Sequence, residues 1–270
     1  MSIDFSGKTV FIIGGSSGIG RELARGLARR GARVAIFARR RAMLDAALED
    51  VKTTRQLHAF ALNAADESET QEVLSRAVAE LGVPDVLINA AGGAKPQEFE
   101  KVTGEDLAWT LNANLYSCWY PCRAIAPLMK RRGHGAIVNI SSMAGLVGVY
   151  GYTDYTLAKA GIIGFSDALR SELKPHGVSV QVLCPPDTET PGFERENETK
   201  PAITAALSEG ARLMTASDVA ERCIAQIGAK PFLILSNRES RFIEFLRRIA
   251  PGLVRGQVDG AIAKALRPAK

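Results

Sequence analysis

A tyrosine and a lysine stand four residues apart in the stretch Tyr155-Thr156-Leu157-Ala158-Lys159. If this stretch is helical, both side chains project from one face and can reach the same ligand. A free tyrosine titrates near about pH 10, and a nearby ammonium favours its phenolate. Such a pair can exchange a proton with an oxygen that gains charge during a reaction. Because Tyr-x3-Lys pairs also occur on ordinary helix surfaces, the interpretation needs support from elsewhere in the chain.

Two polar residues upstream of this pair occupy positions where chemistry is expected. Ser142 ends a strand-like run thirteen residues before Tyr155, which would place it at the carboxyl edge of a parallel sheet, where ligands bind. Its hydroxyl can hold a carbonyl oxygen, and Ser141 is the residue expected to cap the following turn. Asn114 lies in a long helical stretch despite its poor helix propensity, which predicts a buried polar role such as carbonyl or water binding. Asn112 is the alternative candidate for this role, at a position expected to be exposed.

A glycine-rich run follows the first strand-like segment and opens a helix-like one. The free N–H groups at a helix amino terminus bind pyrophosphate, and the absence of a Cβ lets the phosphate approach the backbone. An ordinary turn between strand and helix is the alternative, which this context disfavours. The residues expected to bind a nucleotide cofactor here are Gly14, Ser16, Ser17, Gly18, Ile19 and Gly20.

The second predicted strand ends in Ala38-Arg39-Arg40-Arg41 and carries no carboxylate that would bind an NAD ribose. Positive charge at this position suits a 2′-phosphate, so Arg39 predicts NADPH/NADP⁺ as the cofactor. A solvated basic start of the next helix is the alternative, and it applies more strongly to Arg40 and Arg41.

The composition limits the class of protein. A chain of 270 residues with 46% apolar and 23% charged residues is typical of one large globular unit. Four scattered cysteines and three histidines share no disulfide or metal-ligand spacing, so we expect no metal. The net charge of +5 is modest, and we expect no nucleic-acid partner. The sequence shows neither an export signal nor a run of about 18 apolar residues, which predicts a cytoplasmic protein without a spanning helix.

Short β-rich apolar runs alternate with helical patterns along the chain. The predicted strands are 9–13, 33–37, 57–62, 86–89, 136–140, 178–183 and 232–235, and the predicted helices are 18–30, 67–81, 105–132, 153–175 and 217–228. This alternation predicts an α/β fold, a Rossmann-type doubly wound seven-stranded parallel sheet with helices on both faces. Residues 1–236 would form this domain. They include a substrate loop at 185–215, whose first part, from Pro185 to about Lys200, is expected to be irregular and functional.

Taken together, these motifs resemble the short-chain dehydrogenase/reductase family over about residues 5–235. The resemblance rests on the order and spacing of the Gly14–Gly20 loop, Asn89-Ala90-Ala91-Gly92, Asn114, Ser142, Tyr155 and Lys159. It implies that Asn114, Ser142, Tyr155 and Lys159 form a catalytic tetrad in which Tyr155 and Lys159 also contact the cofactor. Lys159 would bind the nicotinamide ribose and relay protons through water held by Asn114. Asn89, Ala90, Ala91 and Gly92 would line the adenosine and ribose side.

Three positions depart from the family pattern. Ile13 stands where threonine is common, Asn63 where an adenine-binding aspartate is common, and Pro186 where glycine is common. Asn63, with Ala64 beside it, is still expected at the adenine, although an amide oxygen accepts more weakly than a carboxylate. The departures therefore put cofactor affinity in doubt and leave the tetrad intact.

A narrower resemblance is to the 3-ketodihydrosphingosine reductases. It is carried by Pro185-Pro186-Asp187-Thr188-Glu189-Thr190-Pro191-Gly192-Phe193, by Glu196-Asn197, by Thr199-Lys200-Pro201 and by Tyr120-Pro121-Cys122-Arg123-Ala124. It implies NADPH-dependent reduction of the 3-keto group of a long-chain lipid ketone, with Pro185, Thr188 and Thr190 at the cofactor. The alternatives are a reductase of another hydrophobic 3-ketone, such as a 3-oxoacyl thioester, and a non-catalytic NADP-sensing protein.

The segment 237–270 is basic, with seven Lys and Arg against two acids from Arg241 onward. Its apolar residues with helical spacing are Phe242, Phe245, Leu246 and Ile249, and Arg241, Arg247 and Arg248 occupy other faces. This pattern predicts an amphipathic helix that either lies peripherally on the cytoplasmic face of a membrane or packs on its own domain or a second subunit. In the resembled family the two longest helices build dimer faces, so a homo-oligomer, dimer or tetramer, is expected.

Overall fold

The computed structural model describes residues 3–50, 57–208, 213–229 and 231–266. Seven parallel strands form one sheet in the order β3-β2-β1-β4-β5-β6-β9. Their bounds are β1 (Thr9–Ile13), β2 (Arg33–Ala38), β3 (Leu57–Ala61), β4 (Val86–Asn89), β5 (Gly135–Ile140), β6 (Val178–Cys184) and β9 (Leu233–Leu235). The predicted seven-stranded doubly wound sheet is confirmed, and each strand matches its predicted bounds to within one residue.

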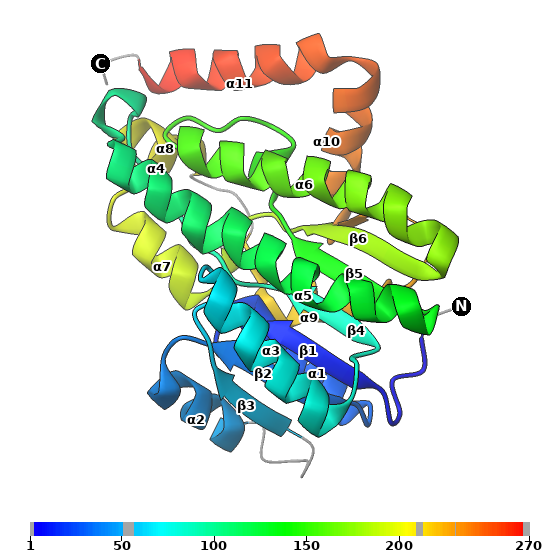
Figure 1. Ribbon diagram of the computed structural model, residues 1–270. Coiled ribbons are helices and arrows are strands. Elements are labelled where there is room, and N and C mark those ends of the chain that lie inside the picture. The colour runs from blue at the N-terminus through cyan, green and yellow to red at the C-terminus, as the bar shows by residue number, and fades with distance from the viewer. Residues whose placement is uncertain (1–2, 51–56, 209–212, 230, 267–270) are drawn as a thin grey trace.

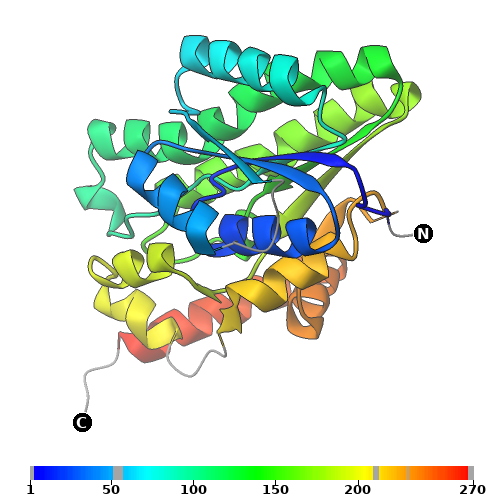
Figure 2. The ribbon, with the colours of Figure 1, turned by 90° about the horizontal axis from the view of Figure 1, so that it is seen from below.

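Helices cover both faces of this sheet (Figures 1 and 2). One face carries α1 (Gly18–Arg29), α2 (Arg41–Asp50) and α9 (Ala216–Ile224), and the other carries α3 (Glu67–Leu81), α4 (Gly104–Leu111), α5 (Ser117–Arg132) and α6 (Thr153–Leu173). Successive strand residues alternate between the two cores: Val10 and Ile12 lie in one, and Phe11 and Ile13 in the other. A strand buried on both faces must be apolar at nearly every position, as β1 is.

The strand order reverses at β1, which lies between β2 and β4. Ile13, the last residue of β1, is level with Phe37 on one side and Asn89 on the other. The loops that follow β1, β2 and β4 therefore open at the same edge of the sheet. In doubly wound folds this is the edge at which ligands bind.

Several elements differ from the prediction. The helix expected over 105–132 is interrupted by a π-helical segment, Asn112–Tyr116, between α4 and α5. Helix α2 was not predicted. The stretch from Pro185 to Lys200 is not irregular, because it contains β7 (Thr188–Glu189), which pairs with β8 (Met214–Thr215), and α7 (Pro191–Asn197). A further short helix, α8 (Ala202–Ser208), follows. Short helices make few periodic contacts, so their sequences carry little helical signal.

The C-terminal segment forms two helices, α10 (Arg238–Ile249) and α11 (Pro251–Ala265), which meet at Ala250. Helix α10 contacts β9, and α11 contacts both α10 and α8 (Figure 1). One side of these helices therefore packs on the rest of the chain, which was one of the alternatives predicted for this segment. Another side leaves large apolar residues exposed: Phe242 at 60%, Phe245 at 56%, Ile249 at 63% and Leu253 at 65%.

Candidate active site

The glycine-rich loop is shaped by close backbone contacts. Gly14 has a φ of +79°, and a Cβ on it would lie 2.6 Å from the backbone nitrogen of Ala91. A Cβ on Gly20 would lie 2.3 Å from the carbonyl oxygen of Gly14. The Ser17 side chain caps none of the N–H groups at the start of α1, so those groups can bind a ligand. The loop thus has the form that a pyrophosphate site requires.

The chain after β6 returns to this loop. A Cβ on Gly18 would lie 3.1 Å from Cγ2 of Thr190, so Thr190 is adjacent to the start of α1. The Oγ1 of Thr190 also accepts a hydrogen bond from the N–H of Phe193 at 3.1 Å and caps α7. Thr188 instead turns inward, and its hydroxyl donates to the carbonyl oxygen of Pro186 at 2.7 Å. The structure therefore brings Thr190, and not the Thr188 hydroxyl, to the glycine-rich loop.

The predicted catalytic pair occupies the first two turns of α6. Lys159 is 3% exposed, and its Nζ donates to the carbonyl oxygen of Ile140 at 3.1 Å. The same Nζ lies 5.4 Å from the centre of the Tyr155 ring. The ammonium is thereby held between the end of β5 and the phenol.

The two serines after β5 do not divide the capping role as predicted. Ser142 caps the turn Met143–Gly145, because its Oγ accepts from the N–H of Ala144 at 3.1 Å. Ser141, predicted as the cap, donates its hydroxyl to the carbonyl oxygen of Lys159 at 2.8 Å. The capping assignment was therefore wrong, since it depended on where α6 packs. Capping uses only the oxygen of Ser142, so its O–H can still donate, and the side chain acts on Tyr155 as a hydrogen-bonding neighbour.

Burial controls the protonation of this centre. It raises the pKa of the Tyr155 phenol well above its usual range, an effect that Glu196 strengthens and Ser142 opposes. Burial also lowers the pKa of Lys159 to about 8. The expectation that Lys159 favours the Tyr155 phenolate together with an oxidised nicotinamide stays a prediction, because in the protein without cofactor desolvation dominates the pKa of Tyr155. At neutral pH the phenol consequently keeps its proton.

Asn114 is fully buried, as predicted, and lies in the π-helical segment. Its Nδ2 donates to the carbonyl oxygens of Gly93 at 2.8 Å and Thr110 at 2.9 Å, and its Oδ1 accepts from the N–H of Gly93 at 3.2 Å. A Cβ on Gly92 would lie 2.7 Å from Oδ1 of Asn114 and 3.1 Å from Nζ of Lys159. Glycine at position 92 thus leaves room at the point where these two side chains meet.

Most residues predicted to line the adenosine side lie near the carboxyl edge of the sheet. Ala90, Ala91 and Gly92 follow β4 and are partly or fully exposed there. Asn89 differs, because it is 2% exposed and its Nδ2 donates to Oδ1 of Asn139 at 2.8 Å. The structure gives the Asn89 side chain a role inside the sheet and not on its ligand edge. The hydrogen bond between Asn89 and Asn139 of β5 could not be predicted without the register of the sheet.

The remaining cofactor residues follow β2 and β3. Arg39 is exposed at the end of β2 and forms no ion pair with another described residue, whereas Arg41 pairs with Asp45 at 2.9 Å. Asn63 is exposed, and its Oδ1 accepts from the N–H of Ala65 at 3.4 Å. Ala64 is buried beside it. Arg39 is therefore available to a phosphate, while the Asn63 side chain is partly engaged with its own turn.

Comparisons with known proteins agree with this geometry. The sequence model of the family described as short chain dehydrogenase matches residues 8–201. The chain belongs to this family.

Among curated proteins, the chain is 35% identical to the 3-dehydrosphinganine reductase of Danio rerio, over 81% of this chain and 68% of that protein. It is also 35% identical to a 3-dehydrosphinganine reductase of Arabidopsis thaliana, over 93% of this chain and 75% of the other. Among solved structures, a short-chain dehydrogenase from Streptomyces avermitilis is 25% identical, with a TM-score of 0.80 over 93% of this chain and 97% of that one. A short-chain dehydrogenase/reductase from Burkholderia phymatum in complex with NAD is 22% identical, with a TM-score of 0.82 over 93% and 96% of the two chains, and shows the shared fold.

Two side chains beside this short-chain dehydrogenase centre were not predicted as site residues. The ring of Tyr152 lies 5.7 Å from that of Tyr155, and its hydroxyl donates to Oε2 of Glu196 at 3.3 Å. Tyr152 precedes Tyr155 by three residues, and Glu196 belongs to the stretch that carries the narrower resemblance. Helical spacing could have indicated Tyr152, but only the fold of α7 brings Glu196 to it.

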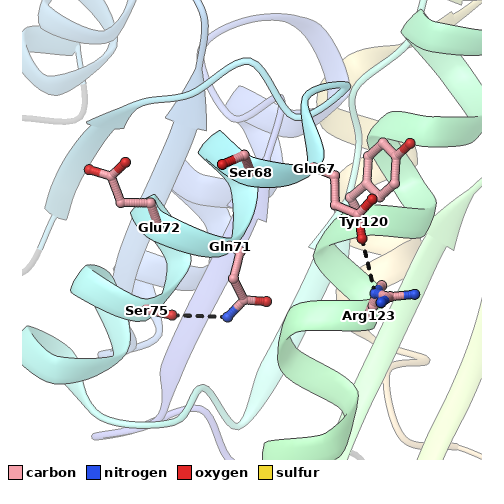
Figure 3. A pocket seen from close by; sticks show the side chains of 7 residues that line it. All are labelled: Glu67, Ser68, Gln71, Glu72, Ser75, Tyr120 and Arg123. Atoms are coloured by element: carbon pink, nitrogen blue, oxygen red, sulfur yellow. Dashed lines mark hydrogen bonds and ion pairs between the residues drawn. The ribbon is translucent and has the colours of Figure 1, made fainter.

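Another part of the narrower resemblance lies away from this centre. Tyr120 and Arg123 line a hollow of about 510 Å³ between α3 and α5, where Nε of Arg123 pairs with Glu67 at 3.1 Å (Figure 3). None of its lining residues belongs to the predicted tetrad or cofactor site.

Proposed function

We propose that this short-chain dehydrogenase reduces the 3-keto group of 3-ketodihydrosphingosine to dihydrosphingosine with NADPH. The observation that carries the proposal is the meeting of Ser142, Tyr155 and Lys159 beside the loop of Thr190, which reaches the glycine-rich turn. The substrate follows from relatives named 3-dehydrosphinganine reductase, whose similarity extends over 81% and 93% of the chain.

In the proposed reaction the ketone gains a hydride at C3 from bound NADPH and a proton at its oxygen. Tyr155 donates that proton, because its raised pKa keeps the phenol protonated at neutral pH. The Ser142 hydroxyl donates a hydrogen bond to the same oxygen and orients the carbonyl. Lys159 supplies positive charge as the phenolate forms, and Asn114 holds the backbone around Gly93 that borders the lysine. Hydride and proton together convert the ketone to the secondary alcohol.

NADPH, in preference to NADH, is proposed from the surroundings of the glycine-rich loop. The cradle at Gly14 fits a pyrophosphate, because a Cβ there would meet the backbone of Ala91 at 2.6 Å. Arg39 lies exposed at the end of β2, where a 2′-phosphate would be bound. Asn63 and Ala64 would contact the adenine.

NADPH oxidation with 3-ketodihydrosphingosine in detergent tests the proposal directly, with a 3-oxoacyl thioester of equal chain length as the control. We expect turnover of the sphingoid ketone and little of the thioester. Turnover confined to the thioester would assign the chain to another hydrophobic 3-ketone.

We also propose that the protein binds the cytoplasmic membrane face peripherally through α10 and the start of α11. Phe242, Phe245 and Ile249 are exposed, and Arg241 and Arg248 are exposed beside them, as in interfacial helices. None of the helices in the described residues has the length and apolarity needed to cross a bilayer. Sedimentation with anionic vesicles should capture the protein, and a Phe242→Asp, Phe245→Asp variant should stay in the supernatant.

A homo-oligomer is proposed through α5 and α6. Trp119 of α5 is 43% exposed, and its ring packs at a tilt against that of Phe165 of α6, with the ring centres 4.7 Å apart; Leu157 is 56% exposed. Exposed apolar residues on two adjacent helices favour a second copy as partner. Sedimentation equilibrium should give a dimer or tetramer, and a monomer at all concentrations would contradict this.

A further inference from the structure

One carboxylate beside the catalytic tyrosine takes no part in the proposed mechanism. Glu196 lies on α7, the helix that Thr190 caps above the glycine-rich loop. Its Oε2 accepts the hydroxyl of Tyr152 at 3.3 Å, and Tyr152 is only 8% exposed. Because the Tyr152 ring lies 5.7 Å from that of Tyr155, Glu196 is tied to the wall of the catalytic centre.

The charge of Glu196 is not neutralised by a contact. It is partly buried and forms no ion pair with another described residue. Lys200 and Lys159 act on it only from a distance, since Nζ of Lys200 lies 4.4 Å from the Phe193 ring and Lys159 donates to Ile140. Burial raises the pKa of Glu196 to about 6. A desolvated carboxylate in this position is stabilised by any cation that enters the site.

A cavity of about 580 Å³ lies beside α7, the helix that carries Glu196, although Glu196 is not one of its lining residues. Its lining is partly apolar and partly polar: the apolar residues are Phe193, Ala205, Ala206 and Leu213, and the polar ones are Asp187, Asn197, Lys200 and Ser208. Glu196 lies three residues after Phe193 on α7, so these two side chains are neighbours on the helix surface. A ligand that places a cation at Glu196 could therefore continue as an alkyl chain along Phe193 and the apolar part of this lining.

We infer that Glu196 binds the 2-ammonium group of the substrate and thereby selects amino ketones over 3-oxoacyl thioesters, an inference that rests on the proposed function. In 3-ketodihydrosphingosine the amine is on the carbon next to the carbonyl. The group that binds the ammonium must therefore lie close to the groups that bind the carbonyl oxygen, as Glu196 does through Tyr152. A 3-oxoacyl thioester has an uncharged methylene at this carbon and would leave the carboxylate without a partner. Glu196 is thus a specificity residue, and Tyr152 is a positioning residue.

Two ketones and two matched variants test the inference. The ketones are 3-ketodihydrosphingosine and 1-hydroxyoctadecan-3-one, which has the same chain and no amine. Glu196→Gln removes the charge at constant shape, and Glu194→Gln makes the same change at an exposed position of the same helix. We expect Glu196→Gln to lower kcat/KM for the amino ketone by about tenfold or more, mainly through KM, as loss of a charge-assisted contact requires. Turnover of the amine-free ketone should change less than about twofold, and Glu194→Gln should alter neither.

Further measurements separate this role from a structural one. NADPH affinity, followed by fluorescence, should be the same in Glu196→Gln as in the unmodified protein. Tyr152→Phe should lower kcat/KM for the amino ketone by less than Glu196→Gln does, because the Glu196 carboxylate keeps its charge but is no longer held in place. Like Glu196→Gln, it should affect the amino ketone more than the amine-free ketone. Equal losses with both ketones, or no loss with either, would overturn the inference while leaving the reductase proposal intact. If the unmodified protein reduced neither ketone, the proposed function itself would fail, and this inference with it.

Discussion

The two sides of the active site are built in different ways. On the cofactor side, the Gly14–Gly20 loop and the ends of β2 and β4 meet through the backbone, where a Cβ on Gly14 or Gly20 would lie 2.6 or 2.3 Å from main-chain atoms. On the proposed substrate side, around α7, the contacts near the centre join side chains: Tyr152 with Glu196, and Lys200 with Phe193. A site shaped by backbone tolerates no added atom, whereas a site shaped by side chains can change its ligand with one substitution.

Removing the group that both sides share should have the largest effect. Tyr155→Phe deletes the proton donor and should lower kcat by about 100- to 10,000-fold. Single-turnover NADPH oxidation at saturating ketone measures this loss, and NADPH fluorescence serves as the control because the glycine-rich loop and Arg39 are unchanged. A variant that kept kcat within about tenfold would remove Tyr155 from the mechanism.

Arg39→Glu tests the one place where the cofactor side is expected to recognise charge. The loss of a phosphate contact should reduce kcat/KM for NADPH by about 10- to 100-fold and raise the relative use of NADH. Arg41→Glu is the matched control, because Arg41 pairs with Asp45 in the protein itself. If both variants kept the preference for NADPH, another residue would bind the 2′-phosphate.

Gly14→Ala tests whether the backbone shapes the cofactor side. The φ of +79° and the 2.6 Å approach to Ala91 should cost about 1–3 kcal/mol of folding free energy, with a parallel loss of NADPH affinity. Gly164→Ala is the control, because a Cβ there has no neighbour within 4 Å and alanine favours helix α6. Thermal unfolding with and without NADPH measures both. Equal stability of the two variants would contradict the comparison.

The pH dependence of amino-ketone reduction should show a smaller effect from the substrate side. Protonation of Glu196, with its pKa of about 6, removes the partner of the ammonium, so kcat/KM should fall as the pH decreases through about 6. Below this pKa the loss approaches tenfold per pH unit at most. The charged and titratable groups acting on Glu196 are Tyr152, Lys200, Asp187 and Lys159, with Tyr155 coupled to it. The acidic limb should be absent in Glu196→Gln and with 1-hydroxyoctadecan-3-one; its persistence in either would assign it to another group.

Much of the cofactor side could be predicted from the sequence because its signals are local. A glycine run between strand and helix, Tyr155 and Lys159 at i and i+4, and apolar runs of strand length each depend on neighbours along the chain. The seven strands followed from these patterns, and the tetrad was implied by the resemblance to the family. The burial of Asn114 could be predicted because asparagine has poor helix propensity, so its presence in a helical stretch indicated a buried polar role.

Other features depended on residues distant in sequence, and only the tertiary structure decided them. Ser142 caps the turn in place of Ser141, because Ser141 instead donates to the carbonyl of Lys159, which packs over the end of β5. Asn89 turned inward because the sheet register places Asn139 beside it. Glu196 reached Tyr152 across 44 residues because α7, too short to be recognised by periodicity, folds back over the centre. Local patterns determine which residues can react, but burial and charge at the site arise from contacts between segments, and these set what the residues bind.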